Sequence, residues 1–192
     1  MSKRSDERVP GVPTTGVSPL PVKIVIAGGT GSGKTTMVRA ISDIEPLSTP
    51  LGGSPNADAP AGQSAAMDFG RVRLDDALML YMFGVPEQER FGFMWDGLTT
   101  GAIGAVVLID SLCIDDCYPA IDYFEHRGMP FVVAVNTPSG RAEPDLDGIR
   151  NFVNLADDTP IRAIDASDWQ SVKHILLLAL HRKRDLLTFA RG

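Results

Sequence analysis

The chain has 192 residues, of which 44% are hydrophobic and 22% are charged, a balance that suits one globular domain with a sizeable core. Its formal net charge of −6 argues against a broad nucleic-acid-binding surface, because an acidic protein surface repels the phosphates of a nucleic acid. No apolar stretch is long enough to cross a bilayer and the N-terminus lacks the apolar core of a signal peptide, so the sequence predicts a cytoplasmic protein.

Residues 1–20 mix charges with prolines and glycines and show no hydrophobic periodicity. Such a composition cannot bury enough apolar surface to order the chain, and predicts a disordered N-terminal tail. A single domain is therefore expected over residues 21–192.

The stretch Gly28–Thr35 is the strongest signal in the sequence. It follows an apolar run at residues 22–27, expected to be a buried strand, and precedes a run at 36–41 that can continue as a helix. This order of strand, loop and helix is the context that the phosphate-loop motif G-x-x-x-x-G-K-[ST] requires, and a simple glycine-rich turn would not need the Lys34-Thr35 pair. Lys34 is placed to reach phosphates, and the Thr35 hydroxyl to ligate Mg²⁺.

Residues 45–62 are too rich in proline, glycine and small residues for a regular element, and are interpreted as a switch segment or an inert flexible insertion. Alternation at residues 66–74, followed by an apolar run at 77–83, predicts an antiparallel hairpin. A polar turn at 84–91 then enters a run of aromatic residues, Phe91, Phe93 and Trp95, which are expected to pack against the sheet.

The second half of the chain alternates predicted strands and helices. Strands are expected at 102–110, 131–135 and 161–164, and helices at 115–127, at 147–155 and from 167 or 168 onward, with irregular structure between 136 and 147. The pattern predicts an α/β fold of the P-loop NTPase class, a mostly parallel sheet with one antiparallel hairpin and helices on both faces. The ligand is expected at the carboxyl ends of the strands.

The order of these motifs resembles a Ras-type small GTPase. Residues 67–71, 83–91 and 131–136 are more closely similar to the bacterial small GTPases of the conservon type, which are related to the gliding-motility Ras-like GTPase. The resemblance covers about residues 20 to 190. It implies a Mg²⁺-dependent GTP/GDP switch with slow hydrolysis, a roadblock-type regulatory protein and a sensor-kinase-like membrane complex as partners, and recruitment to the inner face of the cell membrane.

The resemblance also implies roles for single residues. Lys34 and Gln88 match catalytic positions, with Gln88 orienting the attacking water, and Thr35 and Ser64 match metal ligands. Base contacts are implied for Asn136, Asp165 and Ala166. Phosphate contacts are implied for Gly28, Gly29, Thr30, Gly31, Ser32, Gly33, Lys34, Thr35 and Thr36.

Two departures from the Ras pattern leave alternatives open. Gly84 stands where D-x-x-G has the aspartate that supports Mg²⁺, with Asp68 as a candidate substitute, and Glu87 replaces a glycine that would meet the γ-phosphate. Residues 136–139 lack the lysine and aspartate of N-K-x-D, which Asp145 or Asp165 could replace. The alternatives are a degenerate GTPase that serves as a protein-binding module and an ATPase that uses the same loop.

Overall fold

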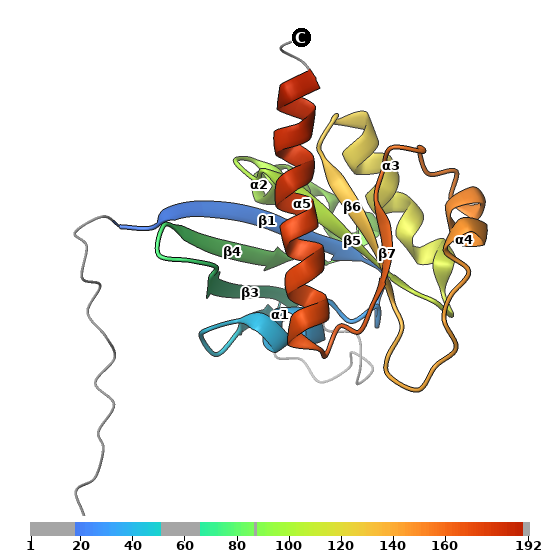
Figure 1. Cartoon of the computed structure of the whole chain (residues 1–192), viewed down its shortest axis with the longest axis horizontal. Coiled ribbons are helices and arrows are strands. Elements are labelled where there is room, and N and C mark those ends of the chain that lie inside the picture. The colour runs from blue at the N-terminus through green and yellow to red at the C-terminus, as the bar shows by residue number, and fades with distance from the viewer. Residues whose placement is uncertain (1–17, 51–65, 87, 190–192) are drawn as a thin grey trace, which may run out of the picture.

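A computed structural model describes residues 18–50, 66–86 and 88–189 of the chain. Seven strands form one sheet, in the order β2-β3-β4-β1-β5-β6-β7 (Figure 1). Only β3 runs opposite to the other strands, since it pairs antiparallel with both of its neighbours and all remaining pairs are parallel. The strands are β1 (Leu20–Gly28), β2 (Leu47–Pro50), β3 (Ala66–Arg73), β4 (Leu78–Gly84), β5 (Gly104–Asp110), β6 (Phe131–Asn136) and β7 (Ile161–Ile164).

Helices cover both faces of the sheet, as its continuous apolar strands require. Helix α5 crosses the front of the sheet in Figure 1 and shares this face with α1. The other face packs against α2, α3 and α4. The helices are α1 (Lys34–Ile41), α2 (Gln88–Thr99), α3 (Tyr118–His126), α4 (Leu146–Phe152) and α5 (Trp169–Phe189), with a short 3₁₀ turn, Ile114–Cys117, before α3.

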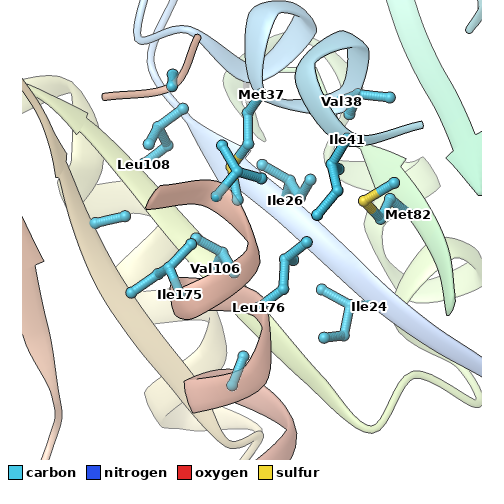
Figure 2. Packing of buried hydrophobic residues seen from close by; sticks show 14 of the residues in the cluster. Ile24, Ile26, Met37, Val38, Ile41, Met82, Val106, Leu108, Ile175 and Leu176 are labelled. Carbon is cyan, nitrogen blue, oxygen red and sulfur yellow. The ribbon is translucent and has the colours of Figure 1, made fainter. Parts of the chain in front are cut away.

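The central strand β1 alternates between the two cores. Ile24 and Ile26 meet Met37 of α1 and Leu176 of α5 on one face (Figure 2), while Val25 and Ala27 point into the other core. These four side chains of β1 are fully buried, which is typical of a parallel strand covered on both faces. The core therefore holds the end of β1, and with it the glycine-rich loop, in a fixed position.

Most predicted elements are confirmed, with shifted ends. Strand β1 begins at Leu20, so the predicted tail is one residue too long at that end, and residues 1–17 lie outside the described part of the chain. The predicted helix at 115–127 starts with the 3₁₀ turn, and α3 proper has a proline, Pro119, in its first turn. A proline is tolerated there because that N–H has no helical partner.

Two predictions are wrong. Residues 47–50 form the edge strand β2 instead of irregular structure; a proline is compatible with an edge strand because one side makes no ladder hydrogen bonds. Residues 88–99 form α2, and the aromatic residues of this stretch do not all pack: Trp95 is buried, whereas Phe93 is 79% exposed. Helical spacing places positions 93 and 95 on different sides of the helix.

Candidate functional site

The glycine-rich loop joins β1 directly to α1, at the carboxyl edge of the parallel strands. Gly33 precedes α1 with φ 106°, a conformation that strongly favours glycine. A side chain on Gly28, where φ is 145°, would overlap the carbonyl oxygen of Leu108 in β5. These two glycines let the loop turn tightly against the sheet, so that the N–H groups at the start of α1 form a ready anion-binding site.

Lys34 reaches back over the loop that precedes it. Its Nζ donates to the carbonyl oxygen of Gly28 at 2.9 Å and to that of Gly29 at 2.7 Å. These bonds hold the ammonium within the curve of the loop. A positive charge at this point, next to the positive end of the α1 dipole, favours binding of a polyphosphate.

The Thr35 hydroxyl donates to a carboxylate of β3, that of Asp68. Asp68 is only 3% exposed, and its other oxygen accepts from the Ser48 hydroxyl of the edge strand β2. Its β4 partner is Gly84, the residue at the position of the missing D-x-x-G aspartate, and a Cβ on Gly84 would lie 3.2 Å from the Asp68 Cβ. In the Ras pattern the aspartate would stand at Gly84 of β4, whereas here the carboxylate comes from Asp68 of the neighbouring strand β3. This position fits the interpretation of Asp68 as a substitute.

The described part of the chain holds no group of three or more His, Cys, Asp or Glu side chains that could bind a metal ion alone. Mg²⁺ needs no such group, because it commonly keeps several waters and is held by one or two carboxylates together with substrate phosphates. The hydroxyl of Thr35 and the carboxylate of Asp68 are oxygen donors of the required kind, beside the phosphate loop. The residues present therefore fit Mg²⁺ bound together with a nucleotide.

Asn136 connects the phosphate loop to the far side of the site. From the end of β6, its Nδ2 donates to the Ser32 carbonyl oxygen at 3.0 Å, and its Oδ1 accepts from the Ala166 backbone N–H at 3.1 Å. A Cβ on Gly33 would lie 2.6 Å from the Asn136 Nδ2, so the packing here is tight. The three predicted segments, around residues 28–35, at 136 and at 165–166, therefore meet at one edge of the sheet.

The loop after β7 is organised by the carboxylate of Asp165. It accepts four hydrogen bonds, from the backbone N–H and the hydroxyl of Ser139 and from the same two groups of Ser167. The bonds from Ser167, followed by those from Ser139, hold the pKa of Asp165 well below its usual range. Asp145, the other candidate for the missing N-K-x-D aspartate, instead accepts from the Gly148 N–H and caps α4.

The structure leaves some predicted site residues untested. Ser64 and Glu87 lie outside the described residues, and Gln88 is described only by its backbone, as the first residue of α2. Thr30 is exposed at the tip of the phosphate loop, and Thr36 is exposed in the first turn of α1. The functional roles of these residues, like those of the other predicted site residues, stay predictions.

Sequence reasoning missed two hydroxyl residues that bind the site's carboxylates, Ser48 and Ser139. Both lie in stretches that the sequence predicted to be irregular. Ser48 contacts Asp68 across 20 residues of sequence, and Ser139 contacts Asp165 across 26 residues. The period-2 alternation that identifies longer strands cannot be recognised in a four-residue strand such as β2. The only residue typical of strands in β2 is the β-branched Thr49, which is too little to predict a strand.

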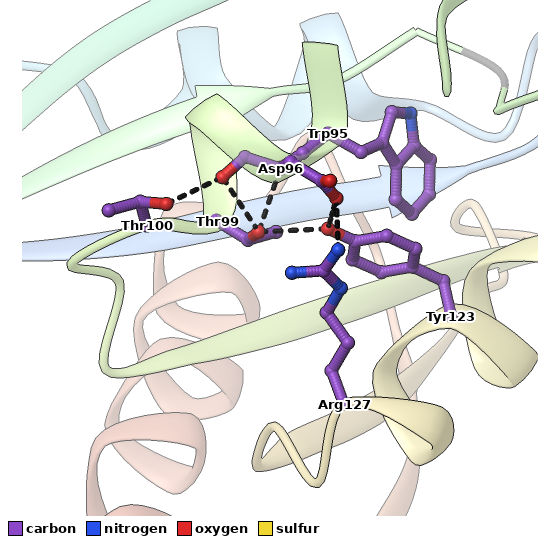
Figure 3. A network of polar contacts seen from close by, with 6 residues as sticks. All are labelled: Trp95, Asp96, Thr99, Thr100, Tyr123 and Arg127. Carbon is purple, nitrogen blue, oxygen red and sulfur yellow. Dashed lines mark hydrogen bonds and ion pairs between the residues drawn. The ribbon is translucent and has the colours of Figure 1, made fainter. Parts of the chain in front are cut away.

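A polar network ties α2 to α3 on the face of the sheet opposite α1. The Tyr123 hydroxyl donates to Asp96 at 2.8 Å and lies 3.0 Å from the Thr99 hydroxyl, while Arg127 pairs with Asp96 (Figure 3). The hydrogen bond from Tyr123, together with the charge of Arg127, lowers the pKa of Asp96. One turn of α2 is therefore anchored to α3.

The buried Trp95 extends this anchor toward the end of β4. Its Nε1–H donates to the Pro86 carbonyl oxygen at 3.0 Å, and its ring packs edge-on against Tyr123. The backbone just after β4 is thereby fastened to the same helix pair, two residues before the start of α2 at Gln88.

No helix within the described residues is both long and apolar enough to cross a membrane. At the C-terminal end, Arg182 pairs with Asp158 at 2.8 Å, and the side chains beyond it lie outside the described part of the chain.

Comparisons with known proteins agree with this geometry. A family model described as "conserved hypothetical ATP binding protein" matches residues 55–178, which begin after the phosphate loop. The chain is also similar to an uncharacterized protein, MJ1339, of Methanocaldococcus jannaschii, with 26% identity over 135 residues, 69% of this chain and 80% of that protein.

Among solved structures, the chain resembles three mutants of S. thermophilus NFeoB, two bound to GDP and one to mGDP. The TM-scores are 0.57, 0.59 and 0.60 at 17–18% identity, covering 84–85% of this chain. The chain spans only 60–62% of the length of those proteins. The α/β fold is that of a P-loop GTPase domain.

Proposed function

Because the chain belongs to the family described as conserved hypothetical ATP-binding proteins and has the fold of a P-loop GTPase, we propose that it is a Mg²⁺-dependent guanine-nucleotide switch with slow hydrolysis. Following the resemblance to conservon GTPases, we place this switch in bacterial signalling. The phosphate loop supplies the anion site, and the base lies against the loops after β6 and β7.

The observation that carries this proposal is the placement of Asp68 between two hydroxyl groups. Thr35 belongs to the phosphate loop and Ser48 to the edge strand β2, and both donate to the same nearly buried carboxylate. A Mg²⁺ ion held by Thr35 and Asp68 would replace the hydrogen bond between them, while the other oxygen of the carboxylate stays bonded to Ser48 of β2. Binding of nucleotide and metal is thereby linked to the position of an edge strand, which is what a switch needs.

Each part of the site has a defined task toward the triphosphate. The backbone N–H groups of the loop and the Lys34 ammonium bind phosphate oxygens, and a bound Mg²⁺ would neutralise charge on the phosphates. In the proposed reaction, water attacks the γ-phosphorus and the bond to the β-γ bridging oxygen breaks. Gln88 at the start of α2 is the residue proposed to orient this water.

Slow hydrolysis is proposed because an arginine supplied by a second protein accelerates such reactions by about 10³–10⁵-fold. On the resemblance, this second protein would be a roadblock-type regulator, with a sensor-kinase-like membrane complex as a further partner. Leu47 on β2 and Phe93 on α2 lie in the proposed switch segments and are 60% and 79% exposed, so both side chains are at the surface that such a partner would meet. Recruitment from the cytoplasm to the inner face of the membrane would follow from these partners.

The test is a titration of purified full-length protein with GTP, GDP, ATP and ADP, with and without Mg²⁺, followed by measurement of phosphate release. We expect Mg²⁺-dependent binding and slow release, both strongly weakened in Lys34→Ala and kept in Lys173→Ala, whose side chain lies over Trp169 on α5. Phosphate release that is unchanged in Lys34→Ala would show that the activity does not arise at this loop.

Adenine nucleotides are the second candidate ligands, favoured by the description of the family. Competition of ATP and GTP for one fluorescent analogue decides between them. Tight binding without turnover, even with a partner present, would instead favour a nucleotide-dependent binding module.

A further inference from the structure

Two loops meet at the base end of the site and hold one carboxylate between them. Asp165 lies in the loop that follows β7. Its carboxylate accepts hydrogen bonds from the backbone N–H and the hydroxyl of Ser139, which lies in the loop that follows β6. Asn136, three residues before Ser139, binds both the phosphate loop through Ser32 and the Asp165 loop through Ala166. The carboxylate is therefore held in a fixed relation to the phosphate loop, within the part of the site that must accept the base.

Resting on the proposed function, we infer that Asp165 is the residue that reads guanine, from the loop after β7, in place of the aspartate missing at Ser139. The purine ligand of this site is accordingly guanine and not adenine.

The four hydrogen bonds to Asp165 divide into two kinds. Two come from the backbone N–H groups of Ser139 and Ser167, each at 2.9 Å, and these fix the position of the carboxylate. Two come from the hydroxyls of the same serines, at 2.8 and 2.6 Å. A serine hydroxyl can rotate to another acceptor, whereas a backbone N–H cannot.

Guanine offers replacements for the two hydroxyl donors. Its N1–H and N2–H₂ groups lie side by side on the Watson–Crick edge, at a spacing that the two oxygens of one carboxylate can accept. Adenine has an acceptor at N1 and no amino group at position 2, so it would face the carboxylate with a lone pair. A charged acceptor fixed by two backbone bonds therefore favours guanine strongly over adenine.

The ionisation state of Asp165 agrees with this role. Its donors, those of Ser167 first, hold its pKa well below the usual range, so the group stays an acceptor of hydrogen bonds throughout the physiological range of pH. Two neighbouring aspartates have other tasks: Asp145 caps α4, and Asp168 accepts from the Ser171 N–H at 2.7 Å in the first turn of α5.

The test uses Asp165→Asn, with competition of GDP, ADP and the xanthine nucleotide XDP against one fluorescent nucleotide. An asparagine presents one acceptor and one donor, which match N1–H and the carbonyl oxygen at position 2 of xanthine. We expect wild-type protein to prefer GDP over ADP, and the variant to lose this preference by at least about tenfold and to gain affinity for XDP. Asp168→Asn is the matched control and should keep the wild-type preference.

A second variant covers the case in which Asp165→Asn does not fold. Ser139→Ala combined with Ser167→Ala keeps the carboxylate and both backbone donors and removes only the competing hydroxyls. We expect it to keep the preference for GDP. Loss of the preference here would make the hydroxyls the readers and would overturn the inference.

Other outcomes separate this inference from the proposed function. Binding of GDP and ADP with equal affinity by wild-type protein, or an unchanged GDP-to-ADP ratio in Asp165→Asn, overturns the role of Asp165 and leaves the phosphate site standing. Failure of folded wild-type protein to bind any nucleotide overturns the proposed function itself.

Discussion

The two ends of the site are built in different ways. At the phosphate end, consecutive residues from Gly28 to Thr35 form the loop, and one distant carboxylate, Asp68, completes it. At the proposed base end, the Ser139 hydroxyl donates to Asp165 across 26 residues of sequence, and the Asn136 side chain accepts from the Ala166 backbone N–H across 30 residues. A phosphate site that uses backbone N–H groups depends on local conformation, whereas a base site depends on which side chains happen to face each other.

Lys34→Ala should break the phosphate end with the largest effect. Hydrogen bonds to charged groups contribute about 1.5–3 kcal/mol, so we expect affinity for nucleotide triphosphates to fall about 10–100-fold. Calorimetry in the presence of Mg²⁺ measures this effect. Unchanged affinity for a triphosphate would mean that the phosphates bind elsewhere.

Asp68→Asn should weaken the effect of Mg²⁺ on nucleotide affinity by at least about tenfold, because Asp68 is a proposed metal ligand and the loss of even an outer-shell partner costs about 10–100-fold. The amide keeps the shape of the side chain and removes the charge. Titrations with Mg²⁺ and with EDTA separate the metal effect from a general loss of affinity. Asp76→Asn, at an exposed carboxylate in the turn after β3, is the control; an equal loss in both variants would argue against a metal role for Asp68.

Asn136→Ala should sharpen the comparison, because Asn136 is the contact between the two ends. Its removal leaves the Ser32 carbonyl and the Ala166 N–H without their side-chain partner. We expect the free energy of unfolding to fall by about 1–3 kcal/mol, together with weaker binding of both nucleosides and triphosphates. Urea unfolding measures the first effect, with the exposed Asn151→Ala on α4 as control. A stable variant with unchanged affinity would mean that the two ends act independently.

The base end should respond to acid through Asp165. Because its folded-state pKa is lowered, its contribution to stability is fully present above the pKa of an unfolded aspartate, about 3.9, and is lost as pH falls below that value toward the folded-state pKa. The difference in unfolding free energy between wild type and Asp165→Asn should therefore be constant from pH 7 to pH 5 and shrink below pH 4. Urea unfolding at pH 7, 5 and 3 checks the trend; a difference that grows on acidification would contradict it.

The smallest effect is expected for Ser32→Ala. The Ser32 hydroxyl is buried and makes no hydrogen bond, so its removal should leave stability unchanged or raise it by up to about 1 kcal/mol. Ser42→Ala is the matched contrast, since the Ser42 hydroxyl donates to the Ile44 carbonyl at 2.8 Å. Thermal unfolding of the two variants should show a loss of stability only for Ser42→Ala.

The sequence predicted the phosphate loop, the central strands and the hairpin because their signals are local. Apolar runs at β1, β5 and β6 are continuous, and glycines at positions 28 and 33 are dictated by the turn itself. Asp68 and Asp165 were recognised as candidates, but their partners Ser48 and Ser139 were not. Those contacts depend on strand order and register, which no local pattern contains.

Helix α2 shows a different limit of sequence reasoning. Its residues combine glycine with aromatic side chains and have no clear apolar stripe, so local propensity favours no helix. Tertiary contacts decide the outcome, because Trp95 is buried against Tyr123 and its indole N–H binds Pro86. Contacts of this kind, which stabilise a helix that its own residues do not favour, can be recognised only in the folded structure.

The antiparallel direction of β3 has one further consequence. Side chains alternate between faces along a strand, so a slip of β3 by a single position against β4 would turn Asp68 away from α1 and bring Phe69 toward it. Such a pairing error would also turn the buried Val72 out of the core, so the proposed metal site and the packing of the hairpin against α1 would be lost together. Insertions at the hairpin turn, residues 74–77, are thus tolerable only when they preserve the opposition of Asp68 and Gly84.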